Sequence, residues 1–268
     1  MKICVLGSGS SGNATLVASA RARVLVDAGF SCREIVRRLS SIGISPEDLH
    51  GVVVSHEHTD HLRGLETLSK RLDIPIYLSR GTWDAIRHDK GSRFRNVRTF
   101  SPGKQFDIED ITFESFSVLH DAADPVGFCI HSGGAKLGVA TDLGKTTHLV
   151  RESLRGSHCL ILESNHDPGM LVRGPYPWWL KQRIKGMFGH LSNEDSSSLL
   201  SDLLHSDLSH VVLAHLSQVN NQEEMAHLNA LRVLREKDCH HIQVRVAGQD
   251  CVTDPILVGE DAQQSGCC

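Results

Sequence analysis

The stretch GVVVSHEHTDH (residues 51–61) joins an apolar run to three histidines and an aspartate. The apolar run predicts a strand, and its period of two points His56 and His58 to the same side. Two imidazoles on one side can hold one ion at ~2.0–2.1 Å. Asp60 and His61 follow where a helix pattern opens, so this pair can face a second ion ~3.5–4 Å away. A histidine-rich loop or core is the weaker alternative, because burying adjacent polar side chains without partners is costly.

Three further polar residues each follow an apolar strand-like run: His120, Asp142 and His215. Strand ends gather along one edge of a layered sheet, so residues distant in the sequence can converge there. A carboxylate can bridge two cations, and this suits Asp142. Alone, His120 or His215 would be an ordinary strand-end histidine. Together with residues 51–61, the repeated placement favours metal ligation.

Alternating strand and helix patterns run through the chain and predict an α/β protein, with two sheets and helices packed outside them. Strands are expected at 2–7, 15–19, 23–29, 51–56, 74–79, 111–120, 126–132, 136–142, 159–165, 210–217 and 243–247. Helices are expected at 32–42, 64–72, 82–88, 193–204 and 222–236. No linker or repeat divides the chain, so we expect one domain over 1–258 and a disordered polar tail over 259–268.

Composition narrows the class of protein. The 268 residues carry a net charge of −4, so nucleic acid could be bound only by a local basic patch. The eight cysteines form no C-x-x-C pair, and free thiols in a reducing compartment explain them. No apolar window is long enough for a membrane span, so a cytoplasmic protein is expected.

Gly7-Ser-Gly-Ser-Ser-Gly12 matches the dinucleotide-binding pattern G-x-G-x-x-G. That pattern needs a helix after it, because the pyrophosphate sits on a helix N-terminus. Residues 13–17 read as another strand instead. A tight hairpin turn that passes close to another group is therefore favoured, and a nicotinamide-dependent oxidoreductase is a distant alternative.

The pattern H-x-H-x-D-H, with a later His, a later Asp and a final His, resembles the metallo-β-lactamase fold superfamily. The resemblance implies a four-layer αββα sandwich with two metal ions at one edge. It implies one ion held by His56, His58 and His120, and another held by Asp60, His61 and His215, with Asp142 bridging. Asp27, at the end of RVLVDAG, matches an early acidic position that would orient a ligand histidine; a simple turn residue is the alternative.

The ligand set contains no cysteine, and imidazole with carboxylate suits two divalent ions, Zn²⁺ or Mn²⁺. Such ions activate water without a serine or cysteine nucleophile, so the predicted reaction is hydrolysis. The predicted catalytic residues are Asp60, Asp142 and His190.

Two segments favour a phosphodiester substrate. Residues 189–195, GHLSNED, form a turn that opens a helix, with Ser192 or Asn193 as its cap. Backbone N–H groups and His190 there can hold a phosphate or protonate a leaving oxygen. The segment resembles the G-H-S-T motif of ribonuclease Z relatives. Residues that follow the strand 159–163 on the same edge can line the substrate path: Asn165, His166 and Asp167.

The second segment, residues 173–185, mixes cations with aromatic residues. Cations suit the phosphates of a nucleic acid, and aromatic rings suit its unstacked bases. An amphipathic helix with tryptophans in the core is an equally good explanation of the aromatic residues, whereas the cations favour function. The cations are Arg173, Lys181, Arg183 and Lys185, and the aromatic residues are Tyr176, Trp178 and Trp179.

Several segments in order resemble the YycJ/WalJ branch of the superfamily: GSGSSGN, SHEHTDH, LHDAADPVGF, ATDLG, LESNHD, GHLSNEDS and LAHLSQVNN. This resemblance implies a bacterial 5′-to-3′ exonuclease whose substrate is DNA rather than RNA. One alternative is a small-molecule hydrolase, such as a thioesterase, a lactonase or a cyclic phosphodiesterase, which the basic segment disfavours. Another is a metal-binding interaction module without catalysis, which the complete ligand set disfavours.

Overall fold

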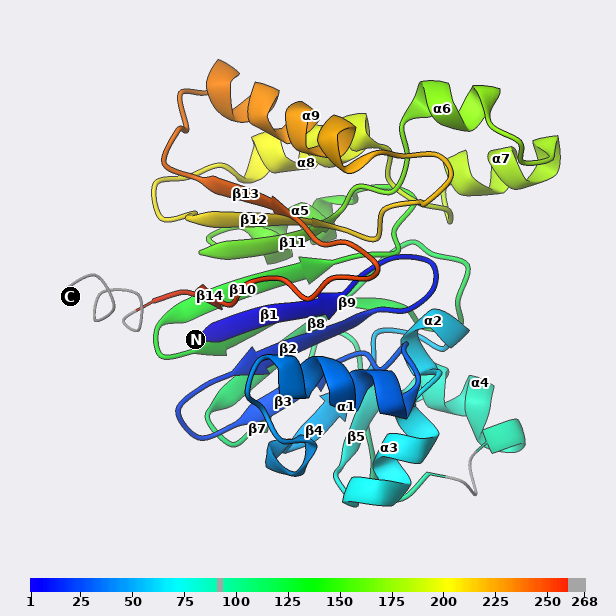
Figure 1. The fold of residues 1–268 in the computed structure, drawn as a ribbon, viewed down its shortest axis with the longest axis vertical. Helices are drawn as coiled ribbons and strands as arrows, with labels where there is room; N and C mark the ends of the chain where they lie inside the picture. The colour runs from blue at the N-terminus through cyan, green and yellow to red at the C-terminus, as the bar shows by residue number, and fades with distance from the viewer. Residues whose placement is uncertain (91–93, 260–268) are drawn as a thin grey trace.

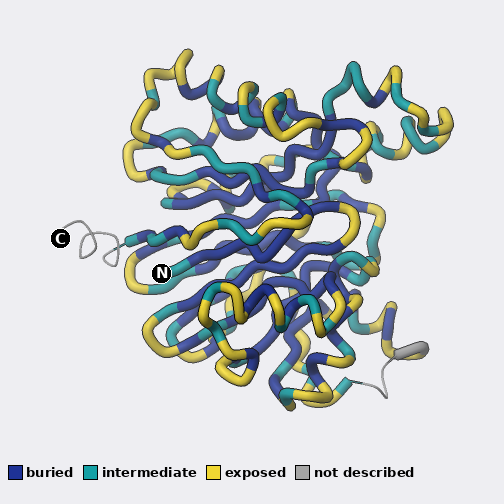
Figure 2. Tube along the Cα trace, viewed as in Figure 1, coloured by how far each residue is buried: buried dark blue, intermediate teal, exposed yellow. Residues whose placement is uncertain are grey.

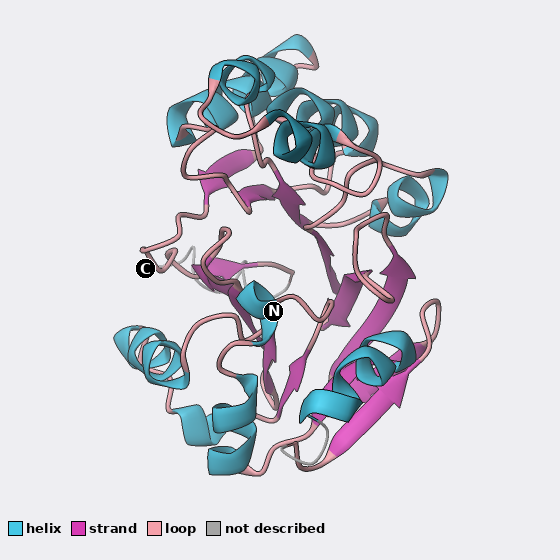
Figure 3. Cartoon of the chain, turned by 90° about the vertical axis from the view of Figure 1, so that its right-hand side faces the viewer, coloured by secondary structure: helices cyan, strands magenta, loops and turns pink. Residues whose placement is uncertain are grey.

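The computed structural model of the chain describes residues 1–90 and 94–259. Two seven-stranded sheets face each other, and helices cover their outer faces (Figures 1 and 3). The predicted four-layer αββα sandwich is confirmed. The disorder expected for the tail falls on residues 260–268, which lie outside the described residues.

The first sheet has the order β14-β1-β2-β3-β4-β5-β6. Hairpins make its first half antiparallel, and strands β3 to β6 run parallel. Its strands are β1 (Lys2–Gly7), β2 (Ala14–Ala18), β3 (Arg23–Val26), β4 (Gly51–Val53), β5 (Ile76–Ser79), β6 (Val97–Phe100) and β14 (Ile256–Leu257).

The second sheet has the order β13-β12-β11-β10-β9-β8-β7. Strands β7 to β10 are antiparallel neighbours, and β10 to β13 run parallel. Its strands are β7 (Gln105–Ile108), β8 (Ile111–Ser117), β9 (Val126–Ser132), β10 (Ala135–Ala140), β11 (Cys159–Glu163), β12 (His210–Ala214) and β13 (Gln243–Val246).

Every predicted strand and helix is present, but seven elements of the described chain were not predicted. Three are strands at sheet edges: β6, β7 and β14. Four are short helices: α2 (Thr59–Leu62), the 3₁₀ helix η1 (Pro46–Asp48), α5 (His148–Leu154) and α6 (Pro168–Arg173). The predicted helices are α1 (Cys32–Ser41), α3 (Leu65–Leu72), α4 (Arg80–Lys90), α8 (Asn193–Leu203) and α9 (Glu223–Glu236). A helix was one of two interpretations of residues 173–185, and α7 (Trp178–Lys185) lies there.

Three buried apolar clusters hold the layers together, and Figure 2 shows the buried trace running through both sheets. One cluster lies between the sheets and includes Val53, Phe113 and Phe128. Another packs the second sheet against α5, α8 and α9, and a third packs the first sheet against α1, α3 and α4. The burial of these side chains is the dominant favourable term in folding, so the layers fix where the strand ends lie.

The six cysteines of the described part are free thiols, as predicted. The hairpin expected at the glycine-rich turn is also present, because β1 and β2 pair across it in an antiparallel ladder. Within the described ranges, no helix is long and apolar enough to cross a membrane.

Candidate metal centre

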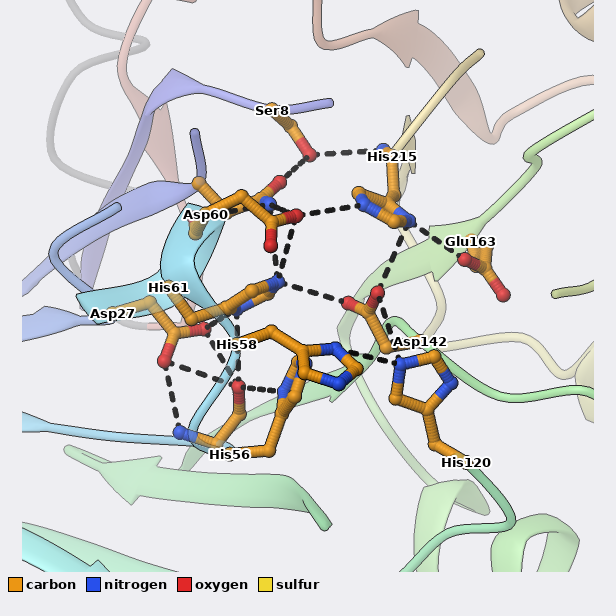
Figure 4. A network of polar contacts seen from close by, with 12 residues as sticks. Ser8, Asp27, His56, His58, Asp60, His61, His120, Asp142, Glu163 and His215 are labelled. Atoms are coloured by element: carbon orange, nitrogen blue, oxygen red, sulfur yellow. Dashed lines mark hydrogen bonds and ion pairs between the residues drawn. The ribbon is translucent and has the colours of Figure 1, made fainter. Parts of the chain in front are cut away.

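The stretch from residue 51 to residue 61 folds as a strand followed by a short helix. Strand β4 ends at Val53, and helix α2 begins at Thr59 after the extended backbone of His58. This change of direction separates the polar residues into two groups (Figure 4). One group is His56, His58 and His120, and the other is Asp60, His61 and His215; in each, the potential ligand atoms lie within 4.8 Å of one another.

Asp142 lies between the two groups. Its Oδ2 is 3.3 Å from Nε2 of His61, in the second group. Its Oδ1 is 3.9 Å from Nε2 of His120, in the first group. Oδ1 also lies 3.3 Å from Nδ1 of His215, in the second group, so the carboxylate reaches both groups, as a bridging ligand must.

Second partners fix the orientation of four of these imidazole rings through Nδ1. Nδ1 of His61 is 2.8 Å from Oδ2 of Asp27, and Nδ1 of His215 is 2.8 Å from Oε1 of Glu163. Nδ1 of His120 is 3.1 Å from the carbonyl oxygen of Gly189, and Nδ1 of His56 is 3.0 Å from Oγ of Ser55. Carboxylates and carbonyls only accept hydrogen bonds, and Oγ of Ser55 already donates to Asp27, so Nδ1 is the donor in each of these contacts. When such a ring is neutral, its Nε2 has the lone pair that can bind a metal ion.

The residues present fit divalent cations. Nε2 of His56 and Nε2 of His215 are buried and have no hydrogen-bond partner among the described residues. Unpaired buried nitrogens are costly unless a ligand satisfies them. Imidazoles that donate their other N–H to a carboxylate or carbonyl are typical of metal-ligating histidines.

Asp27 makes the contact that the resemblance implied. It accepts hydrogen bonds from Ser55 N at 2.8 Å and from Ser55 Oγ at 2.9 Å, in addition to its contact with His61. The simple turn residue considered from the sequence is excluded, because the carboxylate is buried against a proposed ligand.

Glu163 is a site residue to which the sequence analysis assigned no role. Its Oε1 lies 2.8 Å from Nδ1 of His190 as well as of His215. Its Oε2 accepts backbone N–H groups of Leu143 and Leu191 at 3.1 and 2.9 Å. Both oxygens are thus occupied by protein donors, so Glu163 positions the two histidines and is not itself a ligand. The only sequence signal was a glutamate that ends the buried strand CLILE.

The glycine-rich turn also reaches the site. Oγ of Ser8 accepts the backbone N–H of His215 at 2.8 Å and donates to Oδ1 of Asn13 at 2.8 Å. Nδ2 of Asn13 lies 3.1 Å from Nε2 of His61 and 3.4 Å from Oδ2 of Asp60. The group that the turn was expected to approach is therefore the candidate metal centre.

Burial and the neighbouring carboxylates shift the pKa values of the histidines in this centre in opposite directions. Burial lowers the pKa of His56 well below its usual value, and burial also lowers that of His120. Burial opposes protonation of His61 and His215 too, but the carboxylates beside them prevail. Asp27 and Asp142 raise the pKa of His61 well above its usual value, and Asp142 and Asp60 raise that of His215 to about 10.

Three site residues have left-handed backbone at strand ends. The φ angles of Asp27, Asp142 and His215 are 63°, 58° and 55°. Non-glycine residues rarely adopt this region, and it is enriched at functional sites held in place by their surroundings. The turn of the backbone directs each side chain into the centre.

The structure gives two predicted substrate-binding residues another role. Asp167 caps α6, accepting the N–H of Met170 at 2.7 Å. Asn193 is 1% exposed and bonds to Ser164 and Asn221. Both side chains have partners within the fold, and their contact with substrate stays a prediction.

The other residues of this set stay near the site. Asn165 donates through Nδ2 to the carbonyl of His215 at 2.9 Å and lines the cavity described below. Ser192 is the N-cap of α8 and accepts the N–H of Asp195 at 3.0 Å. His166 is 3% exposed, and burial lowers its pKa to about 4.

The four predicted cations fall into two pairs. Nζ of Lys181 donates to the carbonyls of Val172 and Gly174, at 2.7 Å each, and Arg183 pairs with Asp121. The side chains of Arg173 and Lys185 have no hydrogen bond or ion pair with any residue that the structure describes. A cavity of about 290 Å³ opens between this segment and His190, and it is lined by Tyr176, Leu180, Arg183 and Ile184 together with Ser10, Asp121, Asn165, Gly189, His190 and Ser217.

Comparisons with known proteins agree with this geometry. The family described as "Beta-lactamase superfamily domain" matches residues 22–216. Exodeoxyribonuclease YycJ of Bacillus anthracis is 38% identical over 238 residues, which cover 87% of this chain and 89% of that protein. Exodeoxyribonuclease WalJ of Streptococcus pneumoniae serotype 2 is 34% identical over 242 residues, covering 88% of this chain and 89% of that protein.

Among solved structures, the metallo-β-lactamase fold protein YhfI of Bacillus subtilis superposes with a TM-score of 0.73. The match covers 94% of this chain and 99% of that chain at 16% identity, so it bears on the fold alone.

Proposed function

Because the chain belongs to the β-lactamase superfamily and is homologous to YycJ and WalJ, we propose that it is a metal-dependent phosphodiester hydrolase acting on DNA. We further propose that it removes nucleotides from the 5′ end. The observation that carries this proposal is the pair of ligand groups with Asp142 between them. The free thiols of the described residues are in keeping with a cytoplasmic protein.

Two metal ions, Zn²⁺ or Mn²⁺, are assigned to these groups. His56, His58 and His120 would hold one ion, Asp60, His61 and His215 the other, and Asp142 would contact both. When bound, the ions supply Lewis-acid catalysis of phosphodiester hydrolysis.

His190 is assigned to proton transfer. Its Nδ1 donates to Glu163, so Nε2 is the atom available to the cavity. The side chain is 22% exposed, in contrast to the fully buried glutamate that holds it. From this position Nε2 can donate a proton to the departing oxygen of the cleaved phosphodiester.

Arg173 and Lys185 are assigned to the backbone of the nucleic acid, because their side chains lack protein partners among the described residues. Ser192 presents the first turn of α8 on the same side as His190, since both line one further cavity. The 290 Å³ cavity is at the lower end of the range for small-ligand sites, which suits one terminal nucleotide and favours attack at an end.

The proposal is tested on end-labelled DNA and RNA, single- and double-stranded, with added Mn²⁺ or Zn²⁺. Single-turnover products from 5′-labelled and 3′-labelled strands define the direction of digestion. Metal content is measured on the same preparations. His58→Ala and Asp142→Asn are compared with His240→Ala, which removes an exposed imidazole in the turn before β13.

We expect early release of labelled mononucleotide from the 5′-labelled strand only, lost in the two site variants and retained in the control. Bound metal without digestion of any nucleic acid would shift the assignment to a small-molecule hydrolase. Bound metal without turnover of nucleic acids, esters or thioesters would indicate an interaction module. A wild-type chain that binds no divalent metal would contradict the site itself.

A further inference from the structure

The segment from Pro168 to Gly189, here called the α6–α7 arm, exposes large apolar side chains. Trp178 and Trp179 are 69% and 66% exposed, and α7 has no buried residue. Of the eight exposed large hydrophobic residues in the described chain, five lie in this arm: Val172, Trp178, Trp179, Met187 and Phe188. Single exposed apolar residues are ordinary, but a group of this kind marks an interaction surface.

This exposure excludes the core position that the sequence left open for the tryptophans. The arm stands out at one corner of the molecule beside the strand ends, and its trace is largely exposed or intermediate (Figures 1 and 2). Tyr176, Leu180 and Ile184 of the arm line the same cavity as His190. The aromatic pair therefore belongs to the helix whose Leu180 and Ile184 form part of the wall of this cavity.

Charge identifies the class of partner. Residues 168–189 contain four lysines and arginines and no aspartate or glutamate, in a chain whose net charge is −4. Lys181 ties α7 to the end of α6, and Arg183 ties it to Asp121, so the arm is held in place. A second copy of the chain is disfavoured as partner, because a symmetric interface would set the same four cations against each other.

We propose that Trp178 and Trp179 form a stacking platform for unpaired bases of the DNA strand whose end enters the metal centre. The inference rests on the proposed function and specifies its substrate as a single-stranded end. Aromatic rings stack on every base, whereas nearby cations hold the phosphates, so the platform tolerates any sequence. A blunt duplex offers no unpaired base and binds more weakly.

The test measures binding of metal-loaded, full-length protein to phosphorothioate oligonucleotides, which resist hydrolysis. Oligo(dT) is compared with an abasic oligonucleotide of equal length, which keeps the backbone charge and lacks bases. The variants are Trp178→Ala/Trp179→Ala and Trp178→Phe/Trp179→Phe. Leu228→Ala removes another exposed apolar side chain, from α9, as the control.

We expect the double alanine variant to bind oligo(dT) on the order of 10- to 100-fold more weakly, with the phenylalanine variant recovering most of the affinity. Wild-type tryptophan fluorescence should be quenched by oligo(dT) and not by the abasic strand. In the double alanine variant only Trp83 remains, which packs against Phe94 in the third core cluster, and its emission should not change.

Equal affinity for oligo(dT) and the abasic strand, or unchanged affinity in the double alanine variant, would overturn the inference. The inference would also be overturned if sedimentation showed a dimer that the double alanine variant dissociates without a change in DNA binding. Binding of the wild-type chain to anionic vesicles but not to oligo(dT) would overturn it as well. These outcomes leave the proposed function standing if the wild-type chain still digests DNA. Failure of the wild type to digest any nucleic acid is a separate result, read in the cleavage assay.

Discussion

Nδ1 of His215 lies 2.8 Å from Oε1 of Glu163, and this contact links a proposed metal ligand to the residue assigned to proton transfer. The same oxygen lies 2.8 Å from Nδ1 of His190. Burial opposes ionisation of Glu163, yet His190 and His215 lower its pKa to about 2, so the carboxylate accepts from both rings. One buried group thus sets the tautomer of two functional histidines.

Replacing Glu163 with Gln should therefore impair metal binding and turnover together. The oxygen of the glutamine amide would have to accept from the Nδ1–H groups of both His190 and His215. Its NH₂ group would then face the backbone N–H groups that Glu163 accepts in the wild type. We expect metal affinity to fall about 10- to 100-fold, as for other partners of metal ligands. Calorimetric metal titration checks this, with Glu114→Gln, a half-exposed glutamate of β8, as control. Unchanged affinity would show that Glu163 does not orient His215.

Asp27→Asn should weaken binding of the metal ion assigned to Asp60, His61 and His215, while preserving the fold. Asparagine tolerates the left-handed φ of 63°, so the change removes charge without adding backbone strain. Because the amide no longer favours Nδ1–H of His61, metal affinity should fall about 10- to 100-fold. Asp73→Asn is the matched control, since Asp73 has a φ of 52° at the C-terminus of α3. Equal metal affinity in both variants would contradict the role of Asp27.

Gly29→Ala should disrupt the centre through the backbone. A Cβ at Gly29 would lie 1.6 Å from the carbonyl oxygen of Asp60 and 2.6 Å from the backbone nitrogen of Asn13. Such a clash must move the metal-binding loop, and we expect a loss in free energy of unfolding of at least about 1–3 kcal/mol, with weaker metal binding. Gly43→Ala meets no atom within 4 Å, so it should cost only the ~1–2 kcal/mol of its left-handed backbone and leave metal affinity unchanged.

Protonation of His166 should lower the free energy of unfolding of the metal-free protein at acid pH. Burial lowers its pKa to about 4, below the ~6.5 of an unfolded chain, so between these values the unfolded state binds more protons. Its contribution to the free energy of unfolding is complete above pH ~6.5 and falls by roughly 2–3 kcal/mol by pH ~4.5. Urea unfolding of wild type and His166→Gln at both pH values measures this. A wild type that loses no more stability than the variant would contradict it.

Salt dependence of DNA binding should identify Arg173 and Lys185 as phosphate contacts. For single-stranded DNA, each phosphate contact contributes about −0.7 to the slope of log affinity against log salt concentration. Arg173→Ala and Lys185→Ala should each reduce the slope by about that amount. Lys104→Ala, in an exposed turn between β6 and β7, should leave it unchanged. Identical slopes in all variants would exclude phosphate contacts by Arg173 and Lys185.

The spacing of residues 56–61 was sufficient to predict two pairs of neighbouring ligands, because neighbouring residues keep their relative directions once a strand end and a turn are known. His120 and His215 were added from their place at strand ends and from the family resemblance. The long, apolar strands and amphipathic helices were predictable for the same local reason. The strands β6, β7 and β14 were not, since each is a short edge strand. The sequence of β6, VRTF, has no clear alternation of apolar and polar residues. Its strand structure therefore depends on pairing with β5.

The sequence by itself determined the α/β class, the candidate ligands in residues 56–61 and the basic character of the arm, because these depend on periodicity, local spacing and residue type. Only the tertiary structure decided that Glu163 serves two histidines, that Ser8 and Asn13 support the centre, and that Trp178 and Trp179 lie outside the core. These relationships join segments far apart in the chain. Their geometry is fixed by packing of the two sheets, which no local pattern encodes.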